Sequence, residues 1–199
     1  MTTLTAVEFL SLDGVMQAPG RPDEDPRGGF ERGGWASEAL ARDPEAAQAS
    51  MGDPSGTGAM LFGRRTYLDL VGHWLGTTDP NPFTEVLRET QKYVVSNTLT
   101  QPLEHPNSTL LAGDPVASVT ALKAQVEGDL VILGSGELVR ALSAARLVDR
   151  YQLTILPVVI GSGTRLFEGT PIDLEVERTF TSPTGIVVGT YRLAPPSGA

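Results

Sequence analysis

The residues best suited to chemistry form a glycine-rich run, DLVILGSGELVRALSAA, from Asp129 to Ala145. Apolar residues end there in Gly134, Ser135 and Gly136, and an amphipathic pattern follows at once, which predicts a buried strand that turns sharply into a helix. Glycines beside the first helical turn leave its unpaired backbone N–H groups open to an anion. The turn therefore either holds a phosphate, such as the pyrophosphate of a dinucleotide, or is a tight corner that needs glycine.

The same run matches the dinucleotide fingerprint of Rossmann folds poorly. Val139 stands where the third glycine of that fingerprint belongs, and the run lies late in the chain. No acidic residue stands convincingly at the end of a following strand to bind a ribose. A conventional Rossmann nicotinamide fold is therefore disfavoured.

A second predicted strand end carries two arginines, in the run LFGRRTY from Leu61 to Tyr67. Gly63 ends an apolar stretch, and Arg64, Arg65 and Thr66 then concentrate positive charge and hydrogen-bond donors within one helical turn. Arginines at a helix N-terminus oppose the helix dipole unless an anion lies between them. The placement indicates an anion site, and its alternative is a pair of solvated surface arginines.

A third predicted strand end carries Ser96 and Asn97, after the apolar pair Val94-Val95. A hydroxyl and an amide can hydrogen-bond a ribose or a phosphate, although Ser-Asn is also ordinary turn chemistry. In open α/β sheets, ligands bind outside the carboxyl ends of the strands. Three polar strand ends therefore predict one site for an anionic ligand.

Composition disfavours other kinds of chemistry. The formal net charge of -9 opposes non-specific attraction to nucleic acid or to an anionic membrane. The chain has no cysteine, so disulfides, cysteine metal sites and thiol nucleophiles are excluded. His73 and His105 follow no metal-ligand pattern, and Ser162 does not form the nucleophile elbow of hydrolases. We expect no nucleic-acid partner and no metal.

The elements that position these motifs alternate between strand and helix. A strand at 4–12 and a long loop at 15–34 come first, followed by a helical region at 35–51 that breaks at Pro44. The remaining pattern predicts a link at 52–58, strands at 59–63, 92–97, 109–111, 129–133 and 149–161, helices at 64–74, 82–90, 115–126 and 136–145, and a hairpin at 172–193. This order indicates an α/β protein with a largely parallel sheet and an antiparallel edge.

The first residues, MTTLTAVEFLSLDG, contain no basic leader region, and no apolar run approaches the roughly 20 residues that a membrane span needs. We therefore expect a soluble, cytoplasmic protein with no membrane partner. Its 199 residues are enough for one sizeable core, so we predict a single domain over 1–199 with a flexible tail at 195–199.

In this order, the motifs resemble the dihydrofolate reductase-like superfamily, in particular the reductase domain of riboflavin-biosynthesis deaminase-reductases and its stand-alone relatives. The resemblance is carried by SLDG at 11–14, LFGRRTY at 61–67, VVSN at 94–97, VILGSGELVRAL at 131–142 and DRYQLTILPVVIGSGTRLF at 149–167. It implies a three-layer fold with a mostly parallel central sheet and an antiparallel C-terminal hairpin at the edge. It also implies NADPH, hydride transfer to a small pterin-like, pyrimidinone-like or carbonyl substrate, and a homodimer.

The resemblance also implies roles for particular residues. Asp13, Trp35 and Thr154 would border the substrate, with the 15–34 loop as a lid. Asp13 and Glu38 are the catalytic candidates, although Asp13 could equally shape its turn, and neither Glu38 nor Asp43 matches the carboxylate of dihydrofolate reductases. The implied NADPH contacts are Gly63, Arg64, Arg65, Thr66, Ser96, Asn97, Gly134, Ser135, Gly136, Glu137 and Leu138. A non-catalytic NADP(H)-binding module or sensor remains the alternative.

Overall fold

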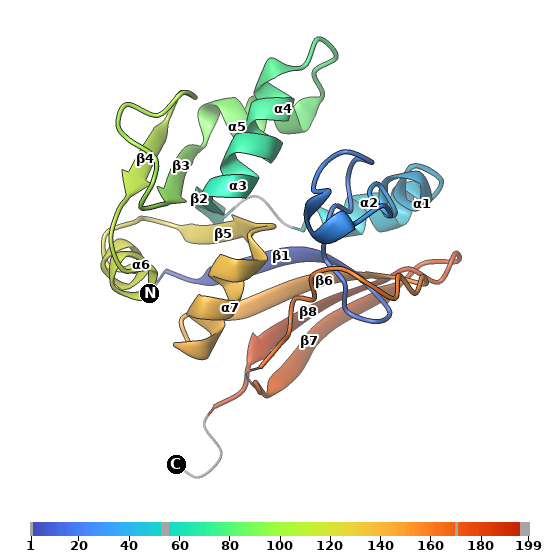
Figure 1. The fold of residues 1–199 in the computed structure, drawn as a ribbon. Coiled ribbons are helices and arrows are strands. Elements are labelled where there is room, and N and C mark those ends of the chain that lie inside the picture. Colours follow the sequence, from blue (N-terminus) through green and yellow to red (C-terminus); the bar gives the residue numbers. More distant parts are fainter. Residues whose placement is uncertain (1, 53–55, 170, 196–199) are drawn as a thin grey trace.

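A computed structural model of the protein describes residues 2–52, 56–169 and 171–195. Parts of the predicted link at 52–58 and nearly all of the predicted tail at 195–199 lie outside the described residues. Figure 1 shows the arrangement of the elements, with helices on both sides of a twisted central sheet.

Within the described residues, the sheet has eight strands in the order β4-β3-β2-β5-β1-β6-β8-β7. All neighbours from β4 to β6 are parallel, whereas β8 is antiparallel to both β6 and β7. The predicted fold class, a mostly parallel sheet with an antiparallel C-terminal hairpin at its edge, is confirmed. The strands are β1 (Leu4–Ser11), β2 (Thr57–Gly63), β3 (Gln91–Val95), β4 (Ser108–Leu111), β5 (Asp129–Leu133), β6 (Arg150–Leu156), β7 (Leu174–Thr181) and β8 (Val187–Leu193).

The helices follow the predicted strand-to-helix rhythm. The helical region at 35–51 breaks at Pro44 as predicted, because Asp43 caps the second helix by accepting a hydrogen bond from the Ala46 N–H at 3.0 Å. The helices are η1 (Arg27–Gly29), α1 (Ser37–Ala41), α2 (Pro44–Ser50), α3 (Arg64–Thr66), η3 (Tyr67–Val71), α4 (Gly72–Gly76), α5 (Pro82–Glu89), α6 (Pro115–Lys123) and α7 (Gly136–Ala144). The run α3–η3–α4 is one continuous helical segment with a π-helical turn in its middle.

Alternation along the strands builds a separate core on each face of the sheet. In β2, Ala59 and Leu61 join an apolar cluster with residues of α6 and α7. Met60 and Phe62 point the other way, into a cluster with residues of η3, α4 and α5. The sheet is therefore the middle of three layers (Figure 1).

The sheet opens along the second half of β1. β1 pairs with β6 from Thr5 to Ser11, but it pairs with β5 only from Leu4 to Val7, because β5 ends at Leu133. The last contact on that side is a long hydrogen bond of 3.4 Å from the Gly134 N–H to the Val7 carbonyl. This divergence leaves Glu8 at the point where the two strands part.

Candidate active site

A cavity of about 1710 Å³ runs along the sheet, past the middle of β1 and the carboxyl ends of β2, β3 and β5. Its volume exceeds the roughly 300–1,000 Å³ typical of pockets for one drug-sized ligand, so there is room for a dinucleotide and a second molecule. The cavity brings together all three predicted strand ends. All eleven predicted cofactor residues line it: Gly63, Arg64, Arg65, Thr66, Ser96, Asn97, Gly134, Ser135, Gly136, Glu137 and Leu138.

The turn between β5 and α7 presents backbone N–H groups to the cavity. Gly134 and Ser135 both have positive φ, at 58° and 66°, so the chain reverses within two residues. Ser135 makes no side-chain capping hydrogen bond to α7. Its hydroxyl instead accepts a hydrogen bond from the Gly63 N–H at 2.9 Å. The first turn of α7 therefore keeps uncapped donors beside the cavity.

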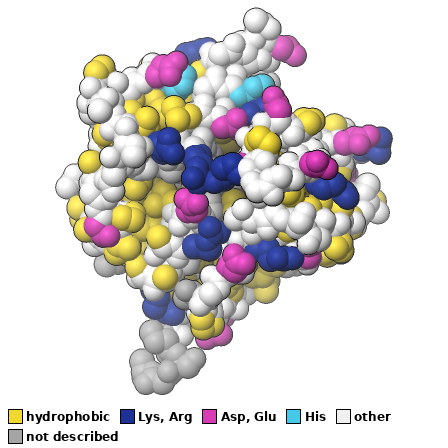
Figure 2. All heavy atoms as spheres, viewed as in Figure 1, with side chains coloured by type: hydrophobic (Ala, Val, Ile, Leu, Met, Phe, Trp, Pro, Cys, Tyr) yellow, Lys and Arg dark blue, Asp and Glu magenta, His cyan; other side chains and the backbone are white. Residues whose placement is uncertain are grey.

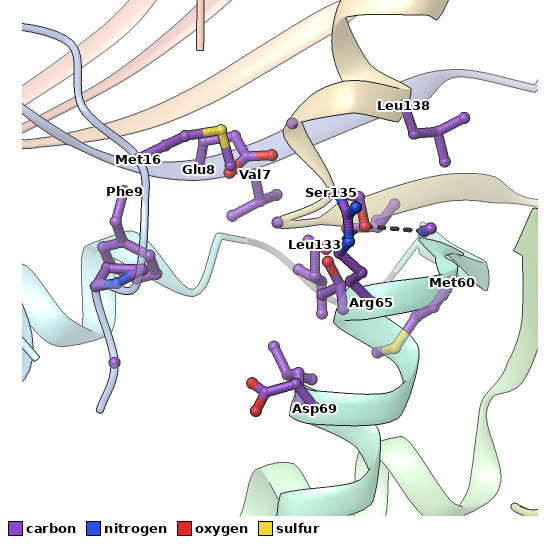
Figure 3. Close-up of a pocket in the computed structure, with 18 of the residues that line it drawn as sticks. Val7, Glu8, Phe9, Met16, Met60, Arg65, Asp69, Leu133, Ser135 and Leu138 are labelled. Atoms are coloured by element: carbon purple, nitrogen blue, oxygen red, sulfur yellow. Dashed lines mark hydrogen bonds between the residues drawn. The ribbon is translucent and has the colours of Figure 1, made fainter. Parts of the chain in front are cut away.

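The arginine-bearing strand end lies against this turn. Besides the bond between Gly63 and Ser135, drawn as a dashed line in Figure 3, Arg65 Nη1 lies 2.9 Å from Glu137 Oε1. A Cβ built on Gly134 would come within 3.1 Å of Thr66 Cγ2, so the two segments approach closely. Two motifs some seventy residues apart in sequence thus form one wall.

Positive charge gathers at this wall in a chain whose net charge is negative. Figure 2 shows Lys and Arg side chains at the centre of the visible face, over the start of α3. Six arginines line the cavity as a whole: Arg27, Arg64, Arg65, Arg140, Arg150 and Arg178. Three of them, Arg27, Arg65 and Arg150, are paired with acidic residues that also line the cavity. Local cations of this kind can attract an anion despite the overall charge.

Ser96 and Asn97 line the cavity, but their polar atoms also hold the local backbone. Ser96 Oγ accepts hydrogen bonds from the N–H groups of Thr98 and Leu99, both at 3.1 Å. Asn97 exchanges two hydrogen bonds with the backbone of Gly113, at 2.6 and 3.2 Å, and so ties the end of β3 to the end of β4. Both the turn chemistry and the cavity position expected of these residues are present.

The predicted lid, the loop at 15–34, covers part of the cavity and is held by polar contacts. Arg21 Nη2 lies 2.5 Å from Asp69 Oδ1 on η3, across the cavity from β1. Glu24 accepts hydrogen bonds from the N–H groups of Gly20 and Arg21, at 2.7 and 2.9 Å, and burial raises the pKa of its carboxyl. The Arg21–Asp69 ion pair therefore joins the loop to the helical side of the cavity.

Gln17 organises the base of this loop. Its amide donates to the carbonyls of Asp25 and Arg27, both at 3.0 Å, and its carbonyl oxygen accepts from the Thr164 N–H at 2.9 Å. Trp35, predicted to border the substrate, donates its Nε1–H to the backbone carbonyl of Gln17 at 2.8 Å. Trp35 is not among the described residues that line the cavity. Its role in the structure is to hold the base of the loop through its hydrogen bond to Gln17.

Asp13 shapes its turn. Its carboxylate accepts hydrogen bonds from Ser11 Oγ at 2.7 Å and from the N–H groups of Ile160 and Gly161 at 3.0 and 2.8 Å. The bond from Ile160, followed by those from Ser11 and Gly161, holds the pKa of Asp13 well below its usual range. Of the two roles left open for Asp13, the structure supplies the structural one, and Asp13 is not among the described residues of the cavity wall.

The structure does not bring Thr154 or Glu38 to the cavity wall, as far as the described residues show. Thr154 is 1% exposed, and its Oγ1 has no hydrogen-bond partner there. Glu38 is exposed on α1 and forms an ion pair with Arg42, one helical turn away. Asp43 caps α2 and accepts a 2.5 Å hydrogen bond from Thr184, so its carboxyl links α2 to the β7–β8 turn.

Glu8 is the cavity residue that sequence reasoning missed. It is 3% exposed, it lines the cavity, and burial raises the pKa of its carboxyl well above the usual value. The missed signal is its register: Leu4, Ala6 and Leu10 are buried on one face of β1, and Glu8 occupies the same face. An acidic residue on an apolar face of a strand is unusual enough to mark a site.

No group of three or more His, Cys, Asp or Glu side chains that could hold a metal ion occurs in the part of the chain that the structure describes. Among the same residues, no helix is long and apolar enough to cross a membrane.

The fold described above is that of the dihydrofolate reductase-like class of proteins. The chain belongs to the RibD C-terminal domain family, whose model matches residues 2–188. The predicted resemblance is thereby confirmed.

Individual relatives agree with this family. YyaP of Bacillus subtilis (strain 168), an uncharacterized protein, is 30% identical over 140 residues, which cover 66% of this chain and 72% of YyaP. A protein of Shewanella sp. PV-4 described as a riboflavin-biosynthesis protein superimposes with a TM-score of 0.65 at 19% identity, over 98% of this chain and 100% of its own. Dihydrofolate reductase from Enterococcus faecalis, solved with NADP(H) and a ligand named RAB-propyl, superimposes with a TM-score of 0.60 at 15% identity, over 97% of each chain.

Proposed function

We propose that this protein is an NADPH-dependent reductase of a small heterocyclic substrate, pterin- or pyrimidinone-like, or of a small carbonyl compound. One observation carries the proposal: the uncapped first turn of α7 and the arginines of α3 form one wall of a large cavity, joined by the bond between Gly63 and Ser135. This is a donor set for a polyphosphate, because backbone N–H groups and guanidinium groups both bind phosphate oxygens.

The residues present fit a dinucleotide in the following way. The turn at 134–138 would hold the pyrophosphate on the backbone N–H groups of α7. Arg64, Arg65 and Thr66 would contact phosphate oxygens from the opposite strand end, and Ser96 and Asn97 would border the adenosine 2′-phosphate. The charge of Arg64 and Arg65 favours NADPH over NADH, since NADPH carries the additional phosphate.

Bound NADPH supplies a hydride to the carbon of a polarised C=N or C=O bond. The protein's own residues would align that bond and exclude water. The loop at 15–34, held by the Arg21–Asp69 ion pair, covers the cavity, and the apolar side chains of Val7, Phe9 and Met16 line its β1 side (Figure 3).

Calorimetric titration with NADPH and with NADH tests the cofactor. We expect NADPH to bind more tightly than NADH, and absence of binding of either cofactor at millimolar concentration would overturn the proposal. Reduction is then tested by the loss of reduced-nicotinamide absorbance with a panel of pterins, pyrimidinones and carbonyl compounds.

A non-catalytic NADP(H)-binding module on the same fold is the second candidate. The observation that favours it is that Asp13 and Glu38, the two acids predicted from the sequence as catalytic, lie off the described cavity wall. NADPH that binds but is never oxidised across the whole panel would support the module, and substrate-dependent oxidation would exclude it.

A further inference from the structure

Glu8 occupies a position that the rest of β1 reserves for the core. The alternate residues Leu4, Ala6 and Leu10 pack into the apolar cluster between the sheet and α6 and α7. Glu8 lies between Ala6 and Leu10 on the same face and is as buried as they are, with 3% exposure. A carboxyl group at such a position costs stability, because burial of a polar group without a hydrogen bond is unfavourable.

The carboxyl has no compensating partner in the described part of the chain. Its Oε1 is buried and makes no hydrogen bond there. Its register partner on β6 is the apolar Leu153, and across the opening toward β5 the nearest paired residue is Leu133. The charged group that acts on Glu8 is Arg140 of α7, which opposes the larger effect of burial on the pKa of the carboxyl.

Glu8 lies where the sheet opens, on the opposite face of β1 from the cavity-lining Val7 and Phe9. Pairing between β1 and β5 stops at Val7, one residue before Glu8, and Glu8 is among the residues that line the cavity. In Figure 3, Glu8 and Met16 lie at the β1 side of the cavity, while Ser135 and Arg65 come from the α7 and α3 side. The buried Glu8 carboxyl thus lies across the cavity from Arg65, the arginine of the proposed phosphate site.

We propose that Glu8 is the catalytic acid of the reduction, which protonates the nitrogen or oxygen of the substrate's C=N or C=O bond. This inference rests on the proposed reductase function. It follows from three observations: an unpartnered carboxyl oxygen, a position on the cavity wall and a dry apolar surrounding, which together keep a proton available for the substrate.

The substrate carbon accepts a hydride, so the electron pair of the C=N or C=O π bond moves to the heteroatom, and the substrate is reduced while the nicotinamide is oxidised. The Glu8 O–H bond breaks, its electron pair stays on the carboxylate, and the proton forms the new N–H or O–H bond. A proton from solvent restores the acid after the product leaves.

Arg140 is the positioning residue for this step. Its Nη1 donates to the Arg165 carbonyl at 2.8 Å, which fixes the guanidinium near the wall. Its positive charge stabilises the Glu8 carboxylate that forms when the proton has moved to the substrate. Among the described residues Arg140 and Glu8 form no direct ion pair, which would favour the ionised form of Glu8 before the reaction.

The first test needs neither cofactor nor substrate. An infrared difference spectrum between the wild type and Glu8→Gln at neutral pH is expected to show the C=O band of a protonated carboxylic acid in the wild type alone. Glu45→Gln, a change of an exposed glutamate on α2, is the matched control and is expected to leave that band in place. A spectrum of an ionised Glu8 at neutral pH would overturn the proposal.

The second test follows NADPH oxidation with a dihydropterin as the C=N probe and benzaldehyde as the C=O probe. We expect Glu8→Gln to lower kcat about a hundred- to ten-thousand-fold and to lose the fall of kcat at alkaline pH, with NADPH affinity unchanged. Glu8→Asp, which retains an acid, is expected to keep that alkaline fall with a smaller loss of kcat, and it also covers the case in which Glu8→Gln does not fold.

The outcomes separate the two proposals. If Glu8→Gln oxidises NADPH with the wild-type kcat and pH profile, Glu8 is not the acid and the reductase function stands. If the wild type binds NADPH but oxidises it with neither probe, or does not bind it, the catalytic role of Glu8 falls with the reductase function.

Discussion

At the scale of single residues, Ser135 links the two strand ends that supply most of the proposed cofactor contacts. Its left-handed backbone lets α7 start immediately, and its hydroxyl accepts from Gly63 and not from its own helix. The glycine and arginine motifs could be predicted from the sequence because their residue types are informative wherever they occur. The hydrogen bond between Ser135 and Gly63 could not be predicted from the sequence, because it depends on β2 and β5 being neighbours in the sheet.

Arg65→Ala tests the phosphate site. If Arg65 makes a charge-assisted bond to a phosphate, its loss should weaken NADPH binding by roughly 1.5–3 kcal/mol, which calorimetric titration can measure. Arg88→Ala is the matched control, because Arg88 is also a half-exposed arginine paired with a glutamate but is not among the described residues of the cavity wall. Equal NADPH affinity in the two variants would remove Arg65 from the site.

Asp13→Asn tests the structural role of Asp13. The hydrogen bonds that lower the pKa of Asp13 stabilise the folded state above the unfolded pKa of about 3.9, and this contribution is lost as the pH falls further toward the folded pKa. We therefore expect Asp13→Asn to lower Tm at neutral pH and to lose less stability than the wild type on acidification. Thermal unfolding of the wild type and of Asp13→Asn from neutral pH down to about pH 3 measures this difference in Tm. Asp79→Asn, a change of an exposed aspartate, is the control. Parallel curves for wild type and Asp13→Asn would contradict the assignment.

At the scale of elements, the alternation of strand and helix was predictable, whereas the opening between β1 and β5 was not. Periodicity defines where each strand lies, but the lengths over which two strands pair depend on where the neighbouring turn leaves the sheet. The apolar residues at alternate positions around Glu8 mark it as unusual in the sequence, but its position on the cavity wall depends on β5 ending at Leu133.

The loop at 15–34 gives a prediction at this scale. Arg21→Ala removes the ion pair with Asp69 and should raise amide hydrogen exchange across the loop and speed NADPH dissociation. Arg32→Ala is the control, since Arg32 is an exposed arginine of the same loop outside the described cavity wall. If both variants exchange at the wild-type rate, the Arg21–Asp69 pair does not hold the lid.

At the scale of the whole molecule, the protein places the buried carboxyl of Glu8 and several arginines in one cavity of a chain whose net charge is -9. Composition predicted the absence of cysteine chemistry and the need for local cations. It could not locate the cavity, which forms only when the long loop, α3 and α7 meet at the open edge of β1. The single domain and the homodimer expected from the sequence remain predictions.

The global stability of the molecule should record the buried acid. Burial raises the pKa of Glu8 in the folded state above its unfolded value of about 4.3. The resulting contribution to the free energy of unfolding is fully present below about pH 4.3 and is lost as the pH rises through the folded pKa. Urea unfolding should therefore show that the stability of Glu8→Gln relative to the wild type increases as the pH rises above about 4.3. A difference that does not change with pH would contradict the burial of an ionisable group at this position.

The most direct measurement of the central claim is a crystal structure of the protein with NADPH. We expect the pyrophosphate on the turn at 134–138, with Arg64 and Arg65 on phosphate oxygens, and the nicotinamide extending toward Glu8 at the opening between β1 and β5. NADPH bound elsewhere, or bound with its nicotinamide away from Glu8, would contradict the account.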